Sequence, residues 1–125
     1  MSAAEQPMIA VIDRDRLTAY GLALLLRDWG YESVVGVSAK EILGRTEARG
    51  RPLAGIVADD RMEDGSTGQD EAAALVALAA RKIPTVVLVS AGDNGANAPD
   101  LAHIPKPIEP FKLRDLLRTM IRIAP

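Results

Sequence analysis

The sequence predicts an α/β protein whose helices cover both faces of a five-stranded parallel sheet. Short aliphatic runs of strand length alternate along the chain with segments of helical spacing. The central run, Leu53–Asp60, is apolar on both faces, which is typical of a buried strand in a parallel sheet, and it ends in two adjacent carboxylates. Because such sheets bind ligands at the carboxyl ends of their strands, Asp59 is the first candidate functional residue.

The composition favours one soluble, cytoplasmic domain. The 125 residues carry 15 Lys and Arg against 17 Asp and Glu, so the net charge of −2 favours neither a nucleic acid nor an anionic membrane as partner. The absence of cysteine excludes disulfides and thiol chemistry. Met1–Pro7 has no basic region of a signal peptide, and the apolar run Leu22–Leu26 is too short to span a membrane. We expect a flexible N-terminus over residues 1–7 and one domain over residues 8–123.

The first strand and helix follow directly from the N-terminus. Met8–Ile12 is a short aliphatic strand. From Leu17 the apolar positions 17, 20, 21, 24 and 25 follow helical spacing, and Gly30 stands where a glycine would end the helix. Tyr31–Val37 is rich enough in β-branched and aromatic residues for a second strand.

The middle of the chain repeats this alternation. Ser38–Glu41 has the pattern of a capping box that opens a helix, and Gly50 closes it. Leu53–Ala58 is the third strand. After the acidic, glycine-bearing stretch Asp59–Gly68, the alanine-rich segment Gln69–Lys82 is a helix by propensity alone.

The last part of the chain departs from the pattern at one place. Thr85–Ser90 is a fourth buried strand and Leu101–Ile104 a fifth. Between them, Ala91–Pro99 is rich in glycine, asparagine and proline, so we expect the helix here to be short or missing. Pro110 stands at the first position of a final helix with apolar residues at 113, 116, 117 and 120.

Four polar side chains should meet at one edge of this sheet. Asp13, Asp59, Ser90 and Lys106 each follow a predicted strand, and the strand-to-helix loops of an open parallel sheet gather at one end. A lysine ammonium and a serine hydroxyl beside carboxylates suit a phosphoryl group that is carried on an aspartate oxygen.

Carboxylates gathered in this way also favour a divalent cation. Asp13 and Asp59, with Asp15 or Asp60, would raise one another's pKa values unless a cation shared the site. Mg²⁺ is the simplest candidate, because it binds one or two carboxylates together with phosphate oxygens. Asp15 is also a candidate N-cap of the first helix, which is our preferred interpretation of this residue.

The ordered set of motifs resembles the receiver domain of two-component response regulators. The resemblance covers Met8 to Met120 and rests on four pieces that follow strands 1, 3, 4 and 5: Val11-Ile12-Asp13, Ile56-Val57-Ala58-Asp59, Val87-Leu88-Val89-Ser90-Ala91 and Lys106-Pro107. It implies a flavodoxin-like sheet of strand order 2-1-3-4-5. It also implies that Asp59 is the phosphoacceptor, that Ser90 binds the phosphoryl group, that Lys106 is its counter-ion and that the Lys106–Pro107 bond is cis.

Several positions depart from the family's pattern. Arg14 replaces the second acid expected after the first strand, so we expect weakened Mg²⁺ binding. Glu63 replaces a proline common after the phosphoacceptor, and by the resemblance Arg61 would offer its backbone carbonyl to the metal. His103 occupies the position of the family's switch aromatic. The segment from Ser90 to Lys106 is several residues shorter than usual, which again predicts a short or missing fourth helix.

The leading functional hypothesis is a signalling domain and not an enzyme. A sensor histidine kinase or phosphotransfer protein would donate a phosphoryl group to Asp59, and Ser90 and His103 would help switch a surface read by a downstream protein. A second copy of the chain is also a candidate partner. At most, the domain would phosphorylate itself from small donors and dephosphorylate itself.

Two alternatives stay open at this point. Arg14, Glu63 and the shortened connection are compatible with a pseudo-receiver that binds partners without phosphorylation. The Asp13-Arg14-Asp15 motif also resembles the Asp-x-Asp opening of haloacid-dehalogenase-type phosphatases, in which the first Asp is the nucleophile and the second the general acid. The chain has no room for the cap domain of such an enzyme, which argues against this alternative.

Overall fold

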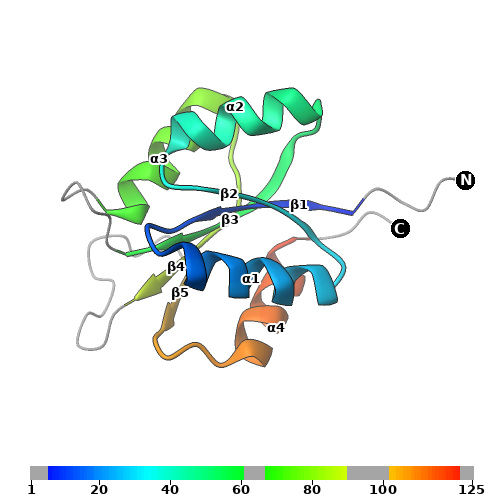
Figure 1. Ribbon diagram of the computed structural model, residues 1–125, viewed down its shortest axis with the longest axis vertical. Coiled ribbons are helices and arrows are strands. Elements are labelled where there is room, and N and C mark those ends of the chain that lie inside the picture. The colour runs from blue at the N-terminus through cyan, green and yellow to red at the C-terminus, as the bar shows by residue number, and fades with distance from the viewer. Residues whose placement is uncertain (1–5, 61–66, 90–101, 122–125) are drawn as a thin grey trace, which may run out of the picture.

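The computed structural model describes residues 6–60, 67–89 and 102–121, which form one five-stranded parallel sheet with helices on both faces (Figure 1). The sheet has the order β2-β1-β3-β4-β5, which confirms the predicted topology. The elements in chain order are β1 (Met8–Ile12), α1 (Arg16–Asp28), β2 (Glu32–Gly36), α2 (Ala39–Arg49), β3 (Leu53–Asp59), α3 (Gly68–Ala79), β4 (Thr85–Val89), β5 (Ala102–Pro105) and α4 (Pro110–Met120).

The sheet separates two apolar cores. α2 and α3 cover one face, and α1 and α4 cover the other (Figure 1). Along β1, Met8, Ala10 and Ile12 face the α2 and α3 side, whereas Ile9 and Val11 face the α1 and α4 side. Every residue of β1 is buried, as expected for a central strand with helices on both sides.

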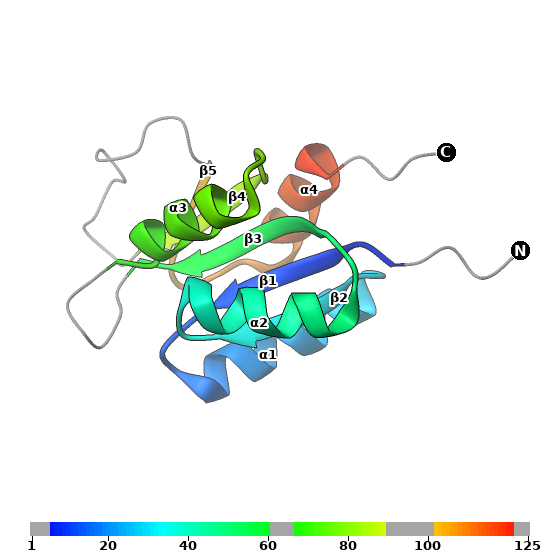
Figure 2. The same cartoon turned by 90° about the horizontal axis from the view of Figure 1, so that it is seen from above.

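The strand registers bring the ends of the strands to one edge (Figure 2). Ile12 pairs with Ala58, Asp59 with Leu88, and Val89 with Pro105. The residues that directly follow β1, β3 and β5 therefore lie at the same edge of the sheet. This edge carries the candidate site.

The predicted helix ends are mostly confirmed. Ser38 caps α2 by accepting a hydrogen bond from the Glu41 backbone N–H at 3.1 Å. The Glu41 carboxylate accepts a hydrogen bond from Arg45, so only the Ser38 half of the predicted capping box is confirmed. Gly50 ends α2 in the left-handed conformation, with φ of 64°. Pro110 is the first residue of α4, as predicted.

The buried face of α1 differs from the predicted one. The helix is where the spacing predicts it, but its buried residues are Ala19, Leu22 and Leu26. Leu17, Tyr20 and Leu24, three of the apolar positions whose spacing predicted the helix, are 83%, 72% and 58% exposed. The segment is apolar around most of its circumference, so helical spacing alone did not determine which side packs on the sheet.

The boundaries of four other elements differ from the prediction. β2 spans Glu32–Gly36 and is one residue shorter at each end than the predicted Tyr31–Val37. α3 ends at Ala79, because Ala80 takes the left-handed conformation and the chain turns towards Pro84 before β4, so the predicted end at Lys82 is wrong. β3 extends through Asp59, and β5 is shifted by one residue to Ala102–Pro105. The segment Ala91–Pro99, where a short or missing helix was predicted, lies outside the described residues. In the described ranges, the structure contains no helix long and apolar enough to cross a membrane.

Candidate functional site

Three carboxylates and one ammonium group gather at the carboxyl edge of the sheet. Asp13 directly follows β1, Asp59 is the last residue of β3, Asp60 comes next, and Lys106 follows β5. The three aspartates are only 3%, 5% and 8% exposed. Burying several carboxylates in this way costs free energy unless cationic or hydrogen-bonding groups compensate them.

Lys106 provides one such compensation. Its Nζ donates a hydrogen bond to Asp59 Oδ1 and lies 3.4 Å from Asp60 Oδ1. Burial alone would lower the pKa of the Lys106 ammonium, but the hydrogen bond to Asp59 and the charges of both aspartates outweigh burial and raise this pKa. The structure thus brings together Asp59 and Lys106, which are 47 residues apart in the sequence.

The sheet and the following loop hold Lys106 in place. Its backbone N–H donates to the carbonyl of Val89 at 2.8 Å, which continues the pairing of β5 with β4. The Lys106–Pro107 peptide bond is cis, as the resemblance implied.

Asp13 lies beside this pair. Its Oδ1 accepts a hydrogen bond from the Asp15 backbone N–H at 2.8 Å. Burial, together with the neighbouring charge of Asp59, raises the pKa of the Asp13 carboxyl, although the Asp15 hydrogen bond and Lys106 oppose this effect. Asp13 and Asp59 are therefore close enough to interact electrostatically, as the topology predicted.

Asp15 caps α1, which confirms the preferred interpretation of this residue. Its Oδ1 accepts hydrogen bonds from the backbone N–H groups of Leu17 at 3.0 Å and Thr18 at 3.4 Å, and its Oδ2 accepts one from the Thr18 hydroxyl. The Thr18 and Leu17 hydrogen bonds lower the pKa of the Asp15 carboxyl. A carboxylate held in this way by the helix is poorly suited to be the general acid of a phosphatase.

Ser90, the predicted hydroxyl donor, and Arg61, whose backbone carbonyl was expected to bind a metal, lie outside the described residues. Glu63, which replaces the family's proline, also lies outside them. His103, the predicted switch residue, is half-buried on β5 and pairs with Val87. Its Nε2 is buried and has no hydrogen-bond partner within the described part of the chain.

Gly68 is a site-supporting residue that the sequence analysis did not assign to this role. It begins α3, and a Cβ added to it would fall 1.5 Å from the backbone carbonyl oxygen of Asp59. Only a residue without a side chain allows α3 to start this close to the end of β3. The glycine is visible in the sequence, but the contact joins two elements across a loop and no local pattern predicts it.

The carboxylates offer a partial fit to a hard divalent cation. Within residues 6–60, 67–89 and 102–121, no group of three or more His, Cys, Asp or Glu side chains is arranged to hold a metal ion. Asp13 and Asp59 form a smaller set, and their mutual repulsion is the kind that a cation relieves. Two carboxylates suffice for Mg²⁺ when water and phosphate oxygens complete its coordination.

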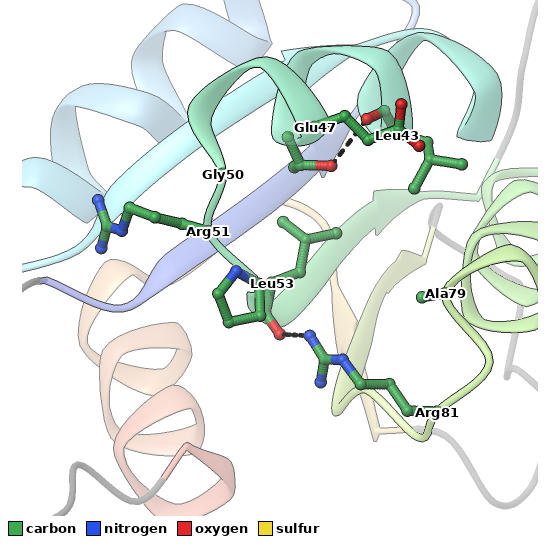
Figure 3. Close-up of a pocket in the computed structure, with 9 residues that line it drawn as sticks. Leu43, Glu47, Gly50, Arg51, Leu53, Ala79 and Arg81 are labelled. Carbon is green, nitrogen blue, oxygen red and sulfur yellow. Dashed lines mark hydrogen bonds between the residues drawn. The ribbon is translucent and has the colours of Figure 1, made fainter.

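A hollow of about 320 Å³ lies at the opposite edge of the sheet (Figure 3). It is bounded by the C-terminal ends of α2 and α3 and by the start of β3. Arg81 spans its rim and donates a hydrogen bond to the carbonyl of Leu53. Leu53 and Asp59 stand at opposite ends of β3, so this hollow is separate from the aspartate and lysine cluster.

Comparison with known proteins identifies the fold. A response regulator receiver domain protein from Clostridium thermocellum superposes with a TM-score of 0.76 and 21% identity, over 92% of this chain and 94% of that chain. A protein described as a response regulator from Chloroflexus aurantiacus gives 0.76 and 22%, over 95% of this chain and 100% of that chain. A chemotaxis protein from Vibrio cholerae gives 0.74 and 19%, over 92% of this chain and 98% of that chain.

These similarities are structural. No protein-family model matches the chain, and no curated protein matches it by sequence. The chain therefore has the fold of response regulator receiver domains, with the predicted strand order.

Proposed function

We propose that this chain, which has the fold of a receiver domain, is a phosphate-accepting signalling domain of a two-component system. The single observation that carries the proposal is the hydrogen bond from the Lys106 ammonium to the buried carboxylate of Asp59. A structural salt bridge would need only Asp59 and Lys106. Two further buried carboxylates, those of Asp13 and Asp60, lie beside this pair, and a lysine ammonium among several carboxylates is typical of a site that transfers an anionic group.

The proposed reaction is the transfer of a phosphoryl group to Asp59. An Asp59 carboxylate oxygen attacks the phosphorus of a phosphohistidine on a sensor kinase or phosphotransfer protein. The phosphorus–nitrogen bond breaks, and the donor imidazole leaves with the electron pair. Lys106 balances the negative charge on the phosphoryl oxygens, and Ser90 is proposed to donate a hydrogen bond to one of them.

Mg²⁺ is the proposed cofactor, with Asp13 and Asp59 as the residues that would hold it. When bound, such an ion neutralises charge on phosphoryl oxygens. Asp15 is left out of the proposed ligand set because its carboxylate caps α1. The guanidinium of Arg14, which is exposed next to Asp13, adds positive charge where a receiver usually has an acid, so we propose weak Mg²⁺ binding.

The proposed output is a change of surface rather than a chemical product. A phosphoryl group that binds one arrangement of the loops better than another shifts the population of the arrangements, and a downstream protein reads the difference. We propose a cytoplasmic location and no enzymatic activity beyond self-phosphorylation and self-dephosphorylation. His103 and Ser90 are the proposed switch residues.

Incubation with acetyl phosphate and Mg²⁺ tests the proposal. Intact-mass measurement should show one added phosphate on the wild type, which Asp59→Asn abolishes and Lys106→Met strongly reduces. Asp115→Asn, an exposed carboxylate on α4, is the matched control and should load as the wild type does. Failure of the folded wild type to gain mass at millimolar donor would refute the proposal.

A phosphorylation-independent interaction module is the second candidate function. The observation that favours it is Arg14, which replaces an expected acid beside Asp13. In this case Asp59→Asn would leave signalling in cells intact. Loss of signalling in that variant, with the protein present at normal level, would exclude this candidate.

A further inference from the structure

The side of α1 that faces away from the sheet carries an apolar stripe (Figure 1). Leu17, Tyr20 and Leu24 form this surface, which we call the α1 stripe, and all three side chains are more than half exposed. Their positions differ by three and four residues, so they lie next to one another on one face of the helix. An exposed apolar face of this kind is typical of a surface that binds another protein.

Gly21 opens a notch in the middle of the α1 stripe. A Cβ added to this glycine would meet no atom within 4 Å, so the packing of the monomer does not require a glycine here. Glycine inside an exposed helix is less favourable than alanine, because it loses more backbone freedom on folding. What a glycine offers at this position is space beside Tyr20, which lets a second helix approach α1 closely.

The α1 stripe is complementary to itself when two copies of the helix pair in opposite directions. Leu17 and Leu24 are equally far from the point between Tyr20 and Gly21. A two-fold axis at this point therefore sets Leu17 of one copy against Leu24 of the other. The same axis sets each Tyr20 over the Gly21 notch of the other copy, so that a large residue meets a small one on both sides.

Charges at the ends of the α1 stripe also favour the antiparallel arrangement. Arg14 stands just before the stripe and Asp28 one turn after it, and both are exposed. In a single helix these charges are unfavourably placed, because the helix dipole favours anions at the N-terminus and cations at the C-terminus. In the antiparallel pair, Asp28 of one copy lies near Arg14 of the other at both ends. Arg16 and Arg27 lie on one flank of the stripe, at the rim of the contact, where solvent screens their like charges.

We propose that the α1 stripe is a dimer interface, in which a second copy of this chain binds antiparallel across a two-fold axis. The inference is independent of the proposed function, because none of the residues assigned to phosphoryl transfer belongs to the stripe. The stripe extends only about 10 Å along the helix, so the interface is small and the dimer should dissociate on dilution.

Sedimentation equilibrium over a series of protein concentrations measures the dissociation constant of the dimer. Gly21→Ala should raise this constant at least about tenfold, because the added methyl group fills the notch. Gly44→Ala is the matched control, because Gly44 also has space for a Cβ but lies within α2, outside the α1 stripe. Both substitutions favour helix formation in the monomer to a similar extent, so a difference between them reports the interface.

An exchange of charges tests the antiparallel arrangement. Arg14→Asp or Asp28→Arg alone should raise the dissociation constant about threefold at low ionic strength, because each sets like charges opposite one another. The double variant should return the constant close to the wild-type value, since opposite charges face each other again. A dimer that forms through another surface, or with parallel helices, gives no such rescue.

Thermal unfolding would verify that each variant folds, and Leu24→Glu, which places a charge in the α1 stripe, is a second disrupting variant if Gly21→Ala does not fold. A wild-type chain that stays monomeric at about 1 mM would overturn the inference and leave the stripe to a helix of another protein. Equal dissociation constants for Gly21→Ala and Gly44→Ala would also overturn it. So would a double charge variant that associates no better than the single ones.

Discussion

Gly68 lies directly against the backbone of Asp59. A Cβ at position 68 would fall 1.5 Å from the Asp59 carbonyl oxygen and 2.7 Å from its carbonyl carbon. The atoms it would meet belong to the backbone of Asp59, which pairs with Leu88 of β4 and directly follows Ala58, a residue paired with both β1 and β4. This backbone cannot move without disturbing the sheet. The start of α3 and the proposed phosphoacceptor are therefore held in one arrangement.

Gly68→Ala is expected to destabilise the protein by about 1–3 kcal/mol, because overpacking forces the backbone apart. Urea unfolding measures this loss. Gly44→Ala is the matched control, because Gly44 is exposed within α2 and its added Cβ would have no neighbour within 4 Å. That substitution should stabilise the protein by roughly 0.5–1 kcal/mol through helix propensity. Equal effects of the two substitutions would contradict the close packing at Gly68.

Substitutions of Asp15 separate its capping role from a role in metal binding. Asp15→Ala removes the acceptor for the first turn of α1 and should lower the unfolding midpoint, whereas Asp15→Asn should retain most of the stability, since Asn is also a good N-cap. Because its hydrogen bonds lower the pKa of Asp15, the stabilisation is present at neutral pH and is lost as the pH falls through this lowered pKa. A large loss of Mg²⁺ affinity in the stable Asp15→Asn variant would show that Asp15 is a ligand after all.

Asp13 should oppose folding at neutral pH. Burial raises its pKa, so the folded protein favours the protonated form and the ionised carboxylate costs stability once the pH is above this raised pKa. Asp13→Asn keeps an oxygen that can accept from the Asp15 N–H and removes the charge. We expect it to be more stable than the wild type at pH 7, because the folded state no longer has to bury an ionised carboxylate.

The difference between these two proteins should shrink as the pH falls and vanish below the ordinary carboxyl pKa of 3.8, where Asp13 is protonated in both folded and unfolded chains. Urea unfolding at several pH values measures it. A stability difference that stays constant with pH would contradict the assigned cause. The same substitution should reduce phosphorylation of Asp59. The Asp13 carboxylate would then lower the stability of the fold while supporting its function.

The topology and the central residues of the site could be predicted because they depend on chain-wide patterns. β1 is buried on both faces, and its bounds, Met8–Ile12, are those predicted from its aliphatic run. The meeting of Asp59 with Lys106 follows from parallel strands ending at one edge, whatever the details of the loops. The contact of Asp60 with Lys106 depends on side-chain direction just beyond a strand, where neither the strand period nor the helix period applies.

The buried face of α1 could not be predicted for a different reason. Leu17, Tyr20 and Leu24 have helical spacing, but so do the residues Ala19, Leu22 and Leu26 that the structure buries. When both sides of a helix are apolar, the short connection from β1 and the shape of the sheet decide which side packs inward. Periodicity then locates the helix and leaves its rotation undetermined.

Alanine substitutions at two leucines of α1 test its rotation. Leu22 belongs to the core between α1 and the sheet, and Leu22→Ala should cost about 2–4 kcal/mol of unfolding free energy, since it leaves a cavity there. Leu24 is 58% exposed, so Leu24→Ala should change stability by less than about 1 kcal/mol. Both substitutions exchange the same residue types within one helix, so helix propensity affects them equally and cancels in the comparison. Urea unfolding of the two variants gives the two costs, and a larger cost at Leu24 than at Leu22 would mean that the helix is rotated from the position described.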